Sequence, residues 1–180
     1  MYFSQFPIIE YDSVGDGEVK TVTHLLKRVA IHSKAKSVTA LYDTHNVRTG
    51  ETPEMIAHKY YGDAEYHWVI LMINNITDRY HQWPMNTRQF LAHLDVRYDN
   101  VNATHHYEIN QVSGDTDVKI DIGLTNIDID GNTIADATLV TNREYEESKQ
   151  DQLRQIQLLD PQYLEQFVEE FEALVSNTED

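Results

Sequence analysis

The nine histidines of this sequence are the side chains best suited to metal chemistry, but their spacing does not form a metal site. No two histidines stand four positions apart, which is the spacing that places two ligands on one helix face. The adjacent pair His105 and His106 would point to opposite faces of a strand. The sequence has no cysteine, so thiolate zinc sites and disulfides are excluded. We therefore expect no metal ligands in this chain.

A second candidate for metal binding is the run around Gly131. Asn126, Asp128 and Asp130 supply oxygen ligands at alternate positions before this glycine, as in the first half of a calcium-binding loop. The twelfth position of that loop is Ala137, where a bidentate Glu is required. A β-hairpin with exposed aspartates accounts for the same residues, and we prefer that interpretation.

The sequence contains none of the short motifs of nucleophilic hydrolysis or nucleotide chemistry. It has no Gly-x-Ser-x-Gly elbow, no P-loop and no Rossmann glycine fingerprint. A cell-wall hydrolase would need only two carboxylates placed by the fold, and the 30 Asp and Glu residues leave that as a remote alternative. We predict that the chain is not an enzyme, with no catalytic residue and no cofactor.

Aromatic residues are concentrated between residues 60 and 83. Trp68 falls on the apolar side of a predicted helix, which favours a place in the core. Tyr61, Tyr80 and Trp83 could instead stack on a sugar or contact another protein. Both roles remain open for these three side chains.

The charge of the chain is strongly negative and unevenly distributed. The formal net charge is −16; residues 1–100 carry 10 Lys and Arg against 12 Asp and Glu, and residues 101–180 carry 4 against 18. Nucleic acids and anionic membranes are polyanions that require Lys and Arg, so neither is an expected partner. The N-terminus lacks the pattern of a signal peptide, and no apolar run could span a membrane, so we expect a cytosol-like compartment.

The elements predicted with the clearest boundaries are two helices that form a hairpin. Thr52 can cap a helix over 53–61 that begins with Pro53, and Gly62 can end it in a left-handed conformation. Asp63 can then cap a second helix that closes at Asn74. Two short helices with so brief a connection form a tight helical hairpin.

The other elements are predicted from periodicity and caps. We expect an α+β fold with a LysM-like helical hairpin module, added helices, a small antiparallel β region and a C-terminal helix. The expected elements are a helix from Thr21 to about Ser33, an extended segment over 41–48, a helix capped by Asn86 and Gln89, alternating strands over 104–140 with a turn at Asp130-Gly131, a charged run over 142–157 capped by Thr141 and Glu144, and a final helix from Asp160-Pro161. The expected organisation is an N-terminal arm and helix (1–40), a LysM-like module with an extra helix (41–100), an acidic β-hairpin region (101–140) and a C-terminal helical segment (141–180).

Residues 50–63, GETPEMIAHKYYGD, together with 70–76, ILMINNI, resemble the LysM module. LysM modules are strand–helix–helix–strand units that bind N-acetylglucosamine polymers such as peptidoglycan or chitin. After Asn75 this sequence continues with 78–85, DRYHQWPM, and a third helix, where a LysM module has its closing strand. We therefore expect that the closing strand of the module is replaced here.

The same hairpin, with HWVILM at 67–72 and with Trp83, is similar to the small wedge protein of T-even-like contractile-tailed phage baseplates. The segment 151–159, DQLRQIQLL, followed by a helix, resembles the C-terminal part of that family. The resemblance is closest over 50–95 and 143–175.

This resemblance implies a structural subunit of the virion that joins adjacent wedges into the six-fold baseplate during tail assembly. Its partners would be other wedge proteins and neighbouring wedges, and it would be synthesised in the cytoplasm of the bacterial host. The alternative is a LysM-type protein that binds peptidoglycan or N-acetylglucosamine. Apolar and aromatic residues at both ends of the chain and in the hairpin region are the candidates for the interface: Phe3, Phe6, Ile8, Tyr61, Tyr80, Trp83, Leu164, Phe167 and Phe171.

Overall fold

Strand β3 (Tyr42–Asn46) pairs antiparallel with strand β7 (Gln155–Leu159), although the two lie far apart in the sequence. The computed structural model describes residues 2–26, 29, 41–113 and 116–176. Contacts within the chain divide it into a first unit, residues 1–83 with 155–180, and a second unit, residues 84–154. The second unit is thus an insertion between two parts of the first.

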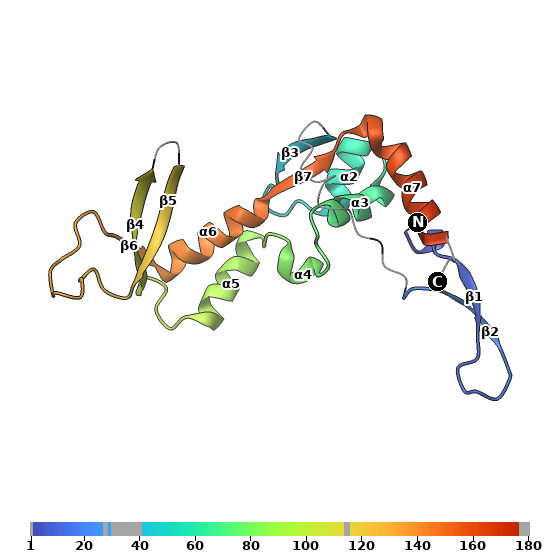
Figure 1. Ribbon diagram of the computed structural model, residues 1–180, viewed down its shortest axis with the longest axis horizontal. Helices are drawn as coiled ribbons and strands as arrows, with labels where there is room; N and C mark the ends of the chain where they lie inside the picture. Colours follow the sequence, from blue (N-terminus) through green and yellow to red (C-terminus); the bar gives the residue numbers. More distant parts are fainter. Residues whose placement is uncertain (1, 27–28, 30–40, 114–115, 177–180) are drawn as a thin grey trace. The chain divides into compact units, whose positions relative to one another are not determined.

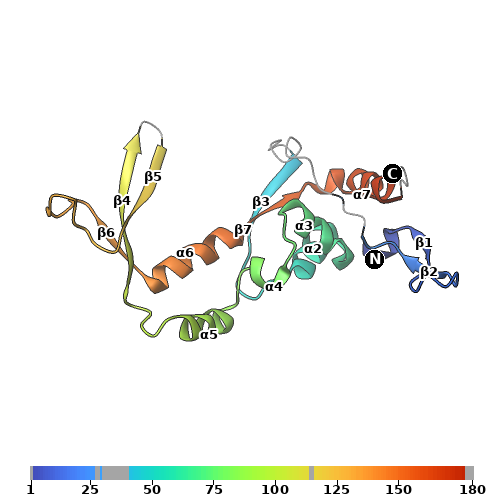
Figure 2. The ribbon, with the colours of Figure 1, turned by 60° about the horizontal axis from the view of Figure 1, so that its bottom comes forward.

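The first unit contains a strand, two helices and a strand in chain order. Helix α2 (Pro53–Tyr61) and helix α3 (His67–Ile73) lie between β3 and β7 in the sequence, and Figures 1 and 2 show both helices beside this pair of strands. As expected, no strand follows directly after Asn75, but the expectation that the closing strand is replaced was wrong for the unit as a whole. The segment after Asn75 does not return to β3, but residues 155–159 do so after the inserted unit.

The caps predicted for α2 are confirmed. Thr52 Oγ1 accepts a hydrogen bond from the Met55 N–H at 3.4 Å, and Pro53 occupies the first turn. Gly62 ends the helix with φ of 82°, a left-handed conformation that costs little only for glycine. Local sequence is therefore sufficient to bound this helix at both ends.

Asp63 caps the next helical segment, as predicted. Its carboxylate accepts the Glu65 N–H at 2.9 Å at the start of η3 (Ala64–Tyr66), which leads directly into α3. The first unit contains two groups of buried apolar side chains, to which the two helices and β7 contribute. One group holds Phe6, Trp68, Val69, Ile73, Leu159, Phe171 and Val175, and the other holds Val47, Ile56, Ala57, Ile70, Trp83, Ile156 and Leu158.

The N-terminal part of the chain forms a β-hairpin. After η1 (Tyr2–Gln5), strand β1 (Ile8–Tyr11) pairs antiparallel with strand β2 (Lys20–Thr23). The predicted helix from Thr21 is therefore wrong over 21–23, because the β-branched run Thr-Val-Thr pairs with β1 in place of forming a helical turn. Most of the rest of that prediction, residues 27–28 and 30–33, lies outside the described residues.

The C-terminal helix begins as predicted. Asp160 accepts the Gln162 N–H at 2.9 Å and caps η4 (Pro161–Tyr163), which continues as α7 (Leu164–Ser176). Phe171 and Val175 are buried on its inner side. A short helix, α4 (Arg79–Gln82), completes the first unit.

The second unit contains two helices and a three-stranded antiparallel sheet. Helix α5 (Thr87–Arg97) has the predicted capping box between Asn86 and Gln89. The strands are β4 (Thr104–Ser113), β5 (Thr116–Gly123) and β6 (Thr138–Thr141), in the order β5-β4-β6. The predicted α+β class is confirmed, and so is a small antiparallel sheet. The strands predicted on either side of Asp130-Gly131 are wrong, because residues 124–137 form only one isolated bridge, between Ile127 and Thr133.

Helix α6 (Asn142–Arg154) follows β6 without a loop. The Glu144 carboxylate accepts the Thr141 N–H at 2.8 Å, and Thr141 Oγ1 accepts the Glu144 N–H at 3.3 Å, so the predicted capping pair is present. The helix ends at Arg154. The last three residues of the predicted run 142–157 instead begin strand β7.

Candidate assembly surface

Aromatic side chains of the N-terminal arm and of α7 meet Trp68 of α3 in one group of rings. This terminal aromatic cluster consists of Phe3, Phe6, Trp68, Phe167 and Phe171. The Phe171 ring centroid lies 4.7 Å from that of Trp68 on α3 and 6.2 Å from that of Phe6. The cluster therefore ties the N-terminal arm and α7 to the hairpin. Sequence reasoning named four of its five members as interface candidates and expected Trp68 in the core, where it lies.

Members of this cluster differ in how much of their surface reaches solvent. Phe6 and Phe171 are buried, while Phe3 lies 6.3 Å from the Phe6 centroid and is 60% exposed. Phe167 is half-buried, 6.1 Å from Trp68. The buried rings thus pack within the chain and support an outer apolar surface to which Phe3 contributes.

Further exposed apolar residues adjoin this cluster in the sequence. Ile8, on β1, is 71% exposed, and Leu174, on α7, is also exposed. Leu164 is half-buried and packs against the group of buried side chains that includes Phe6 and Phe171. A hydrogen bond from Gln5 Nε2 to Glu172 Oε1, 3.2 Å long, links the arm to α7 at the surface. This combination of polar links and exposed apolar side chains resembles a typical protein interface.

The three aromatic candidates of the hairpin region have different environments. Trp83 is buried, and its Nε1–H donates to the Glu51 carbonyl oxygen at 2.9 Å. Tyr61 is half-buried and packs edge-on against Tyr60 and Tyr66. Tyr80, on α4, is 87% exposed and is the one of the three whose ring is open to a partner.

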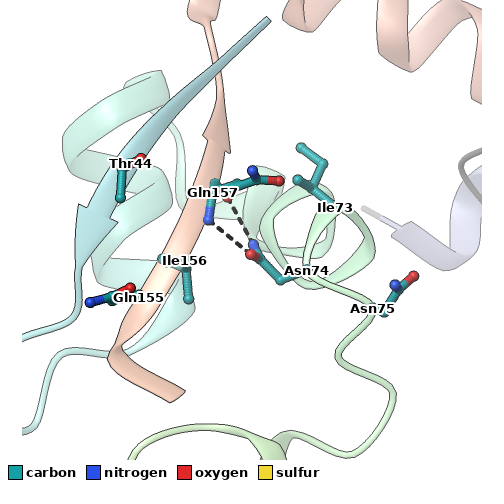
Figure 3. Close-up of a pocket in the computed structure, with 7 residues that line it drawn as sticks. All are labelled: Thr44, Ile73, Asn74, Asn75, Gln155, Ile156 and Gln157. Atoms are coloured by element: carbon teal, nitrogen blue, oxygen red, sulfur yellow. Dashed lines mark hydrogen bonds between the residues drawn. The ribbon is translucent and has the colours of Figure 1, made fainter. Parts of the chain in front are cut away.

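A polar groove lies where β7 passes the end of α3, and the sequence analysis missed it. Its volume is about 440 Å³, and its lining consists of uncharged residues: Thr44, Ile73, Asn74, Asn75, Gln155, Ile156 and Gln157. Figure 3 shows the Asn74 amide hydrogen-bonded to the backbone of Gln157 in this groove. The Asn-Asn pair after an apolar helix was the available signal, but its partner strand could not be identified from sequence.

The second unit contains a buried carboxylate surrounded by cations. Glu146 is buried; its Oε1 accepts the Tyr98 hydroxyl at 2.9 Å and lies 3.3 Å from Arg97 Nε and 3.7 Å from Lys149 Nζ. Burial by itself would raise the pKa of Glu146, but the Tyr98 hydrogen bond and the charges of Lys149 and Arg97 outweigh it and lower this pKa. The arrangement fixes α6 to the end of α5, and it does not expose the carboxylate for chemistry.

His105 and His106 are not on opposite faces, which corrects our expectation. The pairing of β4 with β6 shifts between Thr104 and His106, so His105 is the extra residue of a β-bulge. The two Nδ1 atoms are 2.8 Å apart, and the His105 ring stacks on Tyr145 with centroids 3.7 Å apart. A bulge was not readable from the alternation of the sequence.

The Asp128 carboxylate, before the expected hairpin turn, accepts hydrogen bonds from the backbone. Asp128 accepts the N–H groups of Asp130 and Asn132 at 2.9 and 2.8 Å. Within residues 2–26, 29, 41–113 and 116–176, no group of three or more His, Asp or Glu is placed to hold a metal ion. Asp128 is therefore a turn-forming residue.

Comparison with known proteins identifies the family. No curated protein matches the chain. The family described as base plate wedge protein 53 matches residues 1–122, which include the N-terminal arm, the helical hairpin and strand β4. In the part of the chain that the structure describes, no helix is long and apolar enough to cross a membrane. The chain belongs to the base plate wedge protein 53 family and is a structural protein of the phage tail baseplate.

Proposed function

We propose that this protein joins adjacent wedges into the six-fold baseplate during tail assembly, and that the terminal aromatic cluster is one of its contact surfaces. The observation that carries the proposal is the exposure of Phe3, whose ring lies beside that of the buried Phe6, and of Ile8, two residues after Phe6 in the chain. Apolar side chains held on a rigid base lose little conformational freedom on binding, and this favours tight association. Tyr80 is proposed as a further contact.

Several properties of the chain support assembly through protein contacts. The net charge of −16 disfavours nucleic acid and anionic membranes as partners. Glu146, a carboxylate with a perturbed pKa, is enclosed by its own neighbours, which supports a non-enzymatic role. We further propose that the protein is synthesised in the host cytoplasm and is then incorporated into the virion.

The double substitution Phe3→Ser with Ile8→Ser tests this function. Both side chains are exposed, so the fold should remain, and the control Val96→Ser removes an apolar side chain of α5 that is even more exposed. Purified variants are mixed with the other wedge proteins of the same phage, and complete baseplates are separated from single wedges by sedimentation. We expect the double variant to lower baseplate yield about tenfold or more, as loss of interface anchors does, while V96S assembles normally. Full assembly by the double variant would refute this role for the cluster.

Binding of N-acetylglucosamine polymers is the second candidate function. It is favoured by the strand–helix–helix–strand order and by the polar groove at Asn74 and Asn75. The groove lacks aromatic side chains for sugar stacking, and both tryptophans are buried, so we rank it second. Retention of the chain on insoluble peptidoglycan or chitin, lost in Asn75→Ala, would favour it over the first proposal.

A further inference from the structure

Strand β3 pairs along one of its edges only. Within the described residues its sheet contains two strands, β3 and β7. The register of the pair extends to Leu41 and Asp160, where the Asp160 N–H donates to the Leu41 carbonyl oxygen at 3.0 Å. Residues that hydrogen-bond across an antiparallel pair alternate with residues whose backbone groups point outward. Tyr42, Thr44 and Asn46 therefore direct their N–H and C=O groups away from β7.

The outer edge of β7 is occupied, whereas the outer edge of β3 is not. Gln157, opposite Thr44, directs its own backbone groups outward, and the Asn74 side chain bonds both of them. No hydrogen bond within the described part of the chain reaches the outward groups of Tyr42, Thr44 and Asn46. Thr44 and Asn46 are exposed. An exposed row of unpaired N–H and C=O groups is a template for a further strand.

This edge lacks several of the features that keep natural edge strands from pairing. Residues 42–46, YDTHN, contain no Lys and no Pro, and their register with β7 has no bulge. Edge strands that must stay unpaired usually carry such features. Only an extended segment presents backbone groups at every second residue, in the spacing that this edge requires. The edge is therefore suited to bind an extended segment.

The charge beside β3 selects the side chain that this segment should carry. Asp43 is exposed, and its carboxylate accepts the Tyr60 hydroxyl. Burial, the hydrogen bond to Asp43 and the charges of Asp43 and Asp160 raise the pKa of Tyr60, so both carboxylates lie near its hydroxyl. Neither carboxylate has an ion pair with a Lys or Arg of the described residues. A Lys or Arg opposite Asp43 would therefore be attracted.

A second copy of this chain fits the edge less well. Two copies of β3 would pair about a two-fold axis, and a two-fold contact closes on itself, so it cannot by itself continue around a ring. Residues 42–46 also contain no Lys or Arg to place opposite Asp43. A different protein is therefore the better occupant.

We propose that the free edge of β3 binds an extended segment of another baseplate protein as an added strand, with a Lys or Arg of that segment opposite Asp43. This inference rests on the proposed role in baseplate assembly, and it adds a contact made by backbone groups to the one made by the terminal aromatic cluster. The backbone hydrogen bonds supply the affinity, and the charge at Asp43 supplies the selectivity.

The substitution Thr44→Pro in the full-length chain tests the added strand. It removes an outward N–H that makes no bond to β7, and proline is tolerated at such positions of edge strands. Thr44→Val is the matched control, because it retains the N–H and nearly the same shape. Circular dichroism verifies folding, and binding of each labelled chain to wedges made from the other wedge proteins is measured by sedimentation. We expect T44P to bind about tenfold or more weakly, while T44V binds like the unmodified chain.

Hydrogen exchange of the unmodified chain provides a second test that needs no substitution. The amides of Tyr42, Thr44 and Asn46 should exchange quickly in the free chain and become protected in the wedge-bound chain. The amides of Asp43 and His45 face β7 and should be protected in both states. Unchanged exchange at Thr44 in the bound chain would overturn the inference, even if T44P does not fold.

Asp43→Asn tests the charge, because asparagine still offers an oxygen to the Tyr60 hydroxyl. We expect D43N to bind wedges about two- to fivefold more weakly, as loss of an exposed ion pair does, and to show less weakening as NaCl is raised. Binding of D43N equal to that of the unmodified chain would overturn the assigned Lys or Arg.

The remaining outcomes separate this inference from the proposed function. Equal binding by T44P and T44V would overturn the added strand alone. A dimer of the isolated chain that T44P dissociates would also overturn it, in favour of a second copy. If the unmodified chain does not join wedges, the proposed function itself fails.

Discussion

The side-chain amide of Asn74 hydrogen-bonds both backbone groups of Gln157, a residue 83 positions later in the chain. Its Nδ2 donates to the Gln157 carbonyl and its Oδ1 accepts the Gln157 N–H, each at 2.8 Å. Nδ2 also donates to the Ile70 carbonyl oxygen at 2.8 Å, at the C-terminus of α3. The Asn74 side chain thus makes the two backbone hydrogen bonds that a neighbouring strand would otherwise make, and it links β7 to the helical hairpin.

Asn74→Ala should therefore destabilise the first unit by about 1–3 kcal/mol, because partly buried backbone groups of Gln157 lose their partner. Chemical denaturation measures the change in the free energy of unfolding. The control is Gln155→Ala, an exposed residue of the same strand, which should change stability by less than about 0.5 kcal/mol. Equal effects of the two substitutions would show that the Asn74 bridge does not hold β7.

Gly62→Ala should destabilise α2 through its backbone conformation alone. A Cβ at Gly62 would meet no atom within 4 Å, but the φ of 82° is unfavourable for alanine. The expected cost is about 1 kcal/mol in the free energy of unfolding. Gly62→Asn should cost less, since asparagine tolerates the left-handed region better. An unchanged melting temperature for G62A would contradict the assignment of Gly62 as the helix cap.

Phe171→Ala should lower the free energy of unfolding by about 3–5 kcal/mol, as is usual for a buried phenylalanine. The ring is 3% exposed and contacts both Phe6 and Trp68. Leu174→Ala, at an exposed position of the same helix, is the control and should have little effect on stability. Near-ultraviolet circular dichroism at the tryptophan bands should change in F171A. If F171A lowered the free energy of unfolding by less than L174A does, α7 would not be held in place by the Phe171 ring.

Acidification should loosen the bulge region of the second unit. Burial and the neighbouring charges of His106 and Lys149 lower the pKa of His105 below its ordinary value of 6.5. The unfolded chain therefore binds a proton at His105 more readily than the folded chain does. The contribution of neutral His105 to the free energy of unfolding is complete above about pH 6.5 and decreases as the pH falls toward the lowered pKa. Asp121 and Glu146 oppose the shift but do not reverse it.

Hydrogen exchange of β4 and α6 should accordingly become faster from pH 7.5 to 5.5, after correction for the intrinsic pH dependence of exchange. His105→Phe preserves an aromatic ring beside Tyr145 and should remove part of this effect. His58→Phe, which alters an exposed histidine of α2, should leave the effect intact. The same loss of protection in H105F as in the unmodified chain would exclude His105 as its source.

The helices were largely predictable because their signals are local. Thr52, Gly62, Asn86 and Asp160 act within a few residues of themselves, and each of them caps the expected segment. The segment at Thr21 was misassigned because helical spacing and β-branched residues pointed to different structures. The hydrogen-bonded pairing with β1 decided in favour of a strand, and the spacing of residues within the segment carries no information about that pairing.

The interface candidates were identified by residue type, but their exposure was not. Phe3 and Phe6 are both phenylalanines and stand three positions apart, yet Phe6 packs on Phe171 while Phe3 is largely exposed. The apolar residues on one face of the sheet β5-β4-β6 were not predicted to lie together, because Ile109, Ile120 and Leu139 come from three strands and only the register brings them to the same face.

The sequence by itself determined the class of the fold, the bounds of the helical hairpin and the acidic character of the chain, since caps, periodicity and charge act over short distances or by simple summation. Tertiary structure alone decided that residues 155–159 close the sheet begun by residues 42–46. Strand pairing depends on backbone hydrogen bonds that every residue except proline can both donate and accept, so the partner strand is chosen by the whole fold, here with one distant side chain, Asn74.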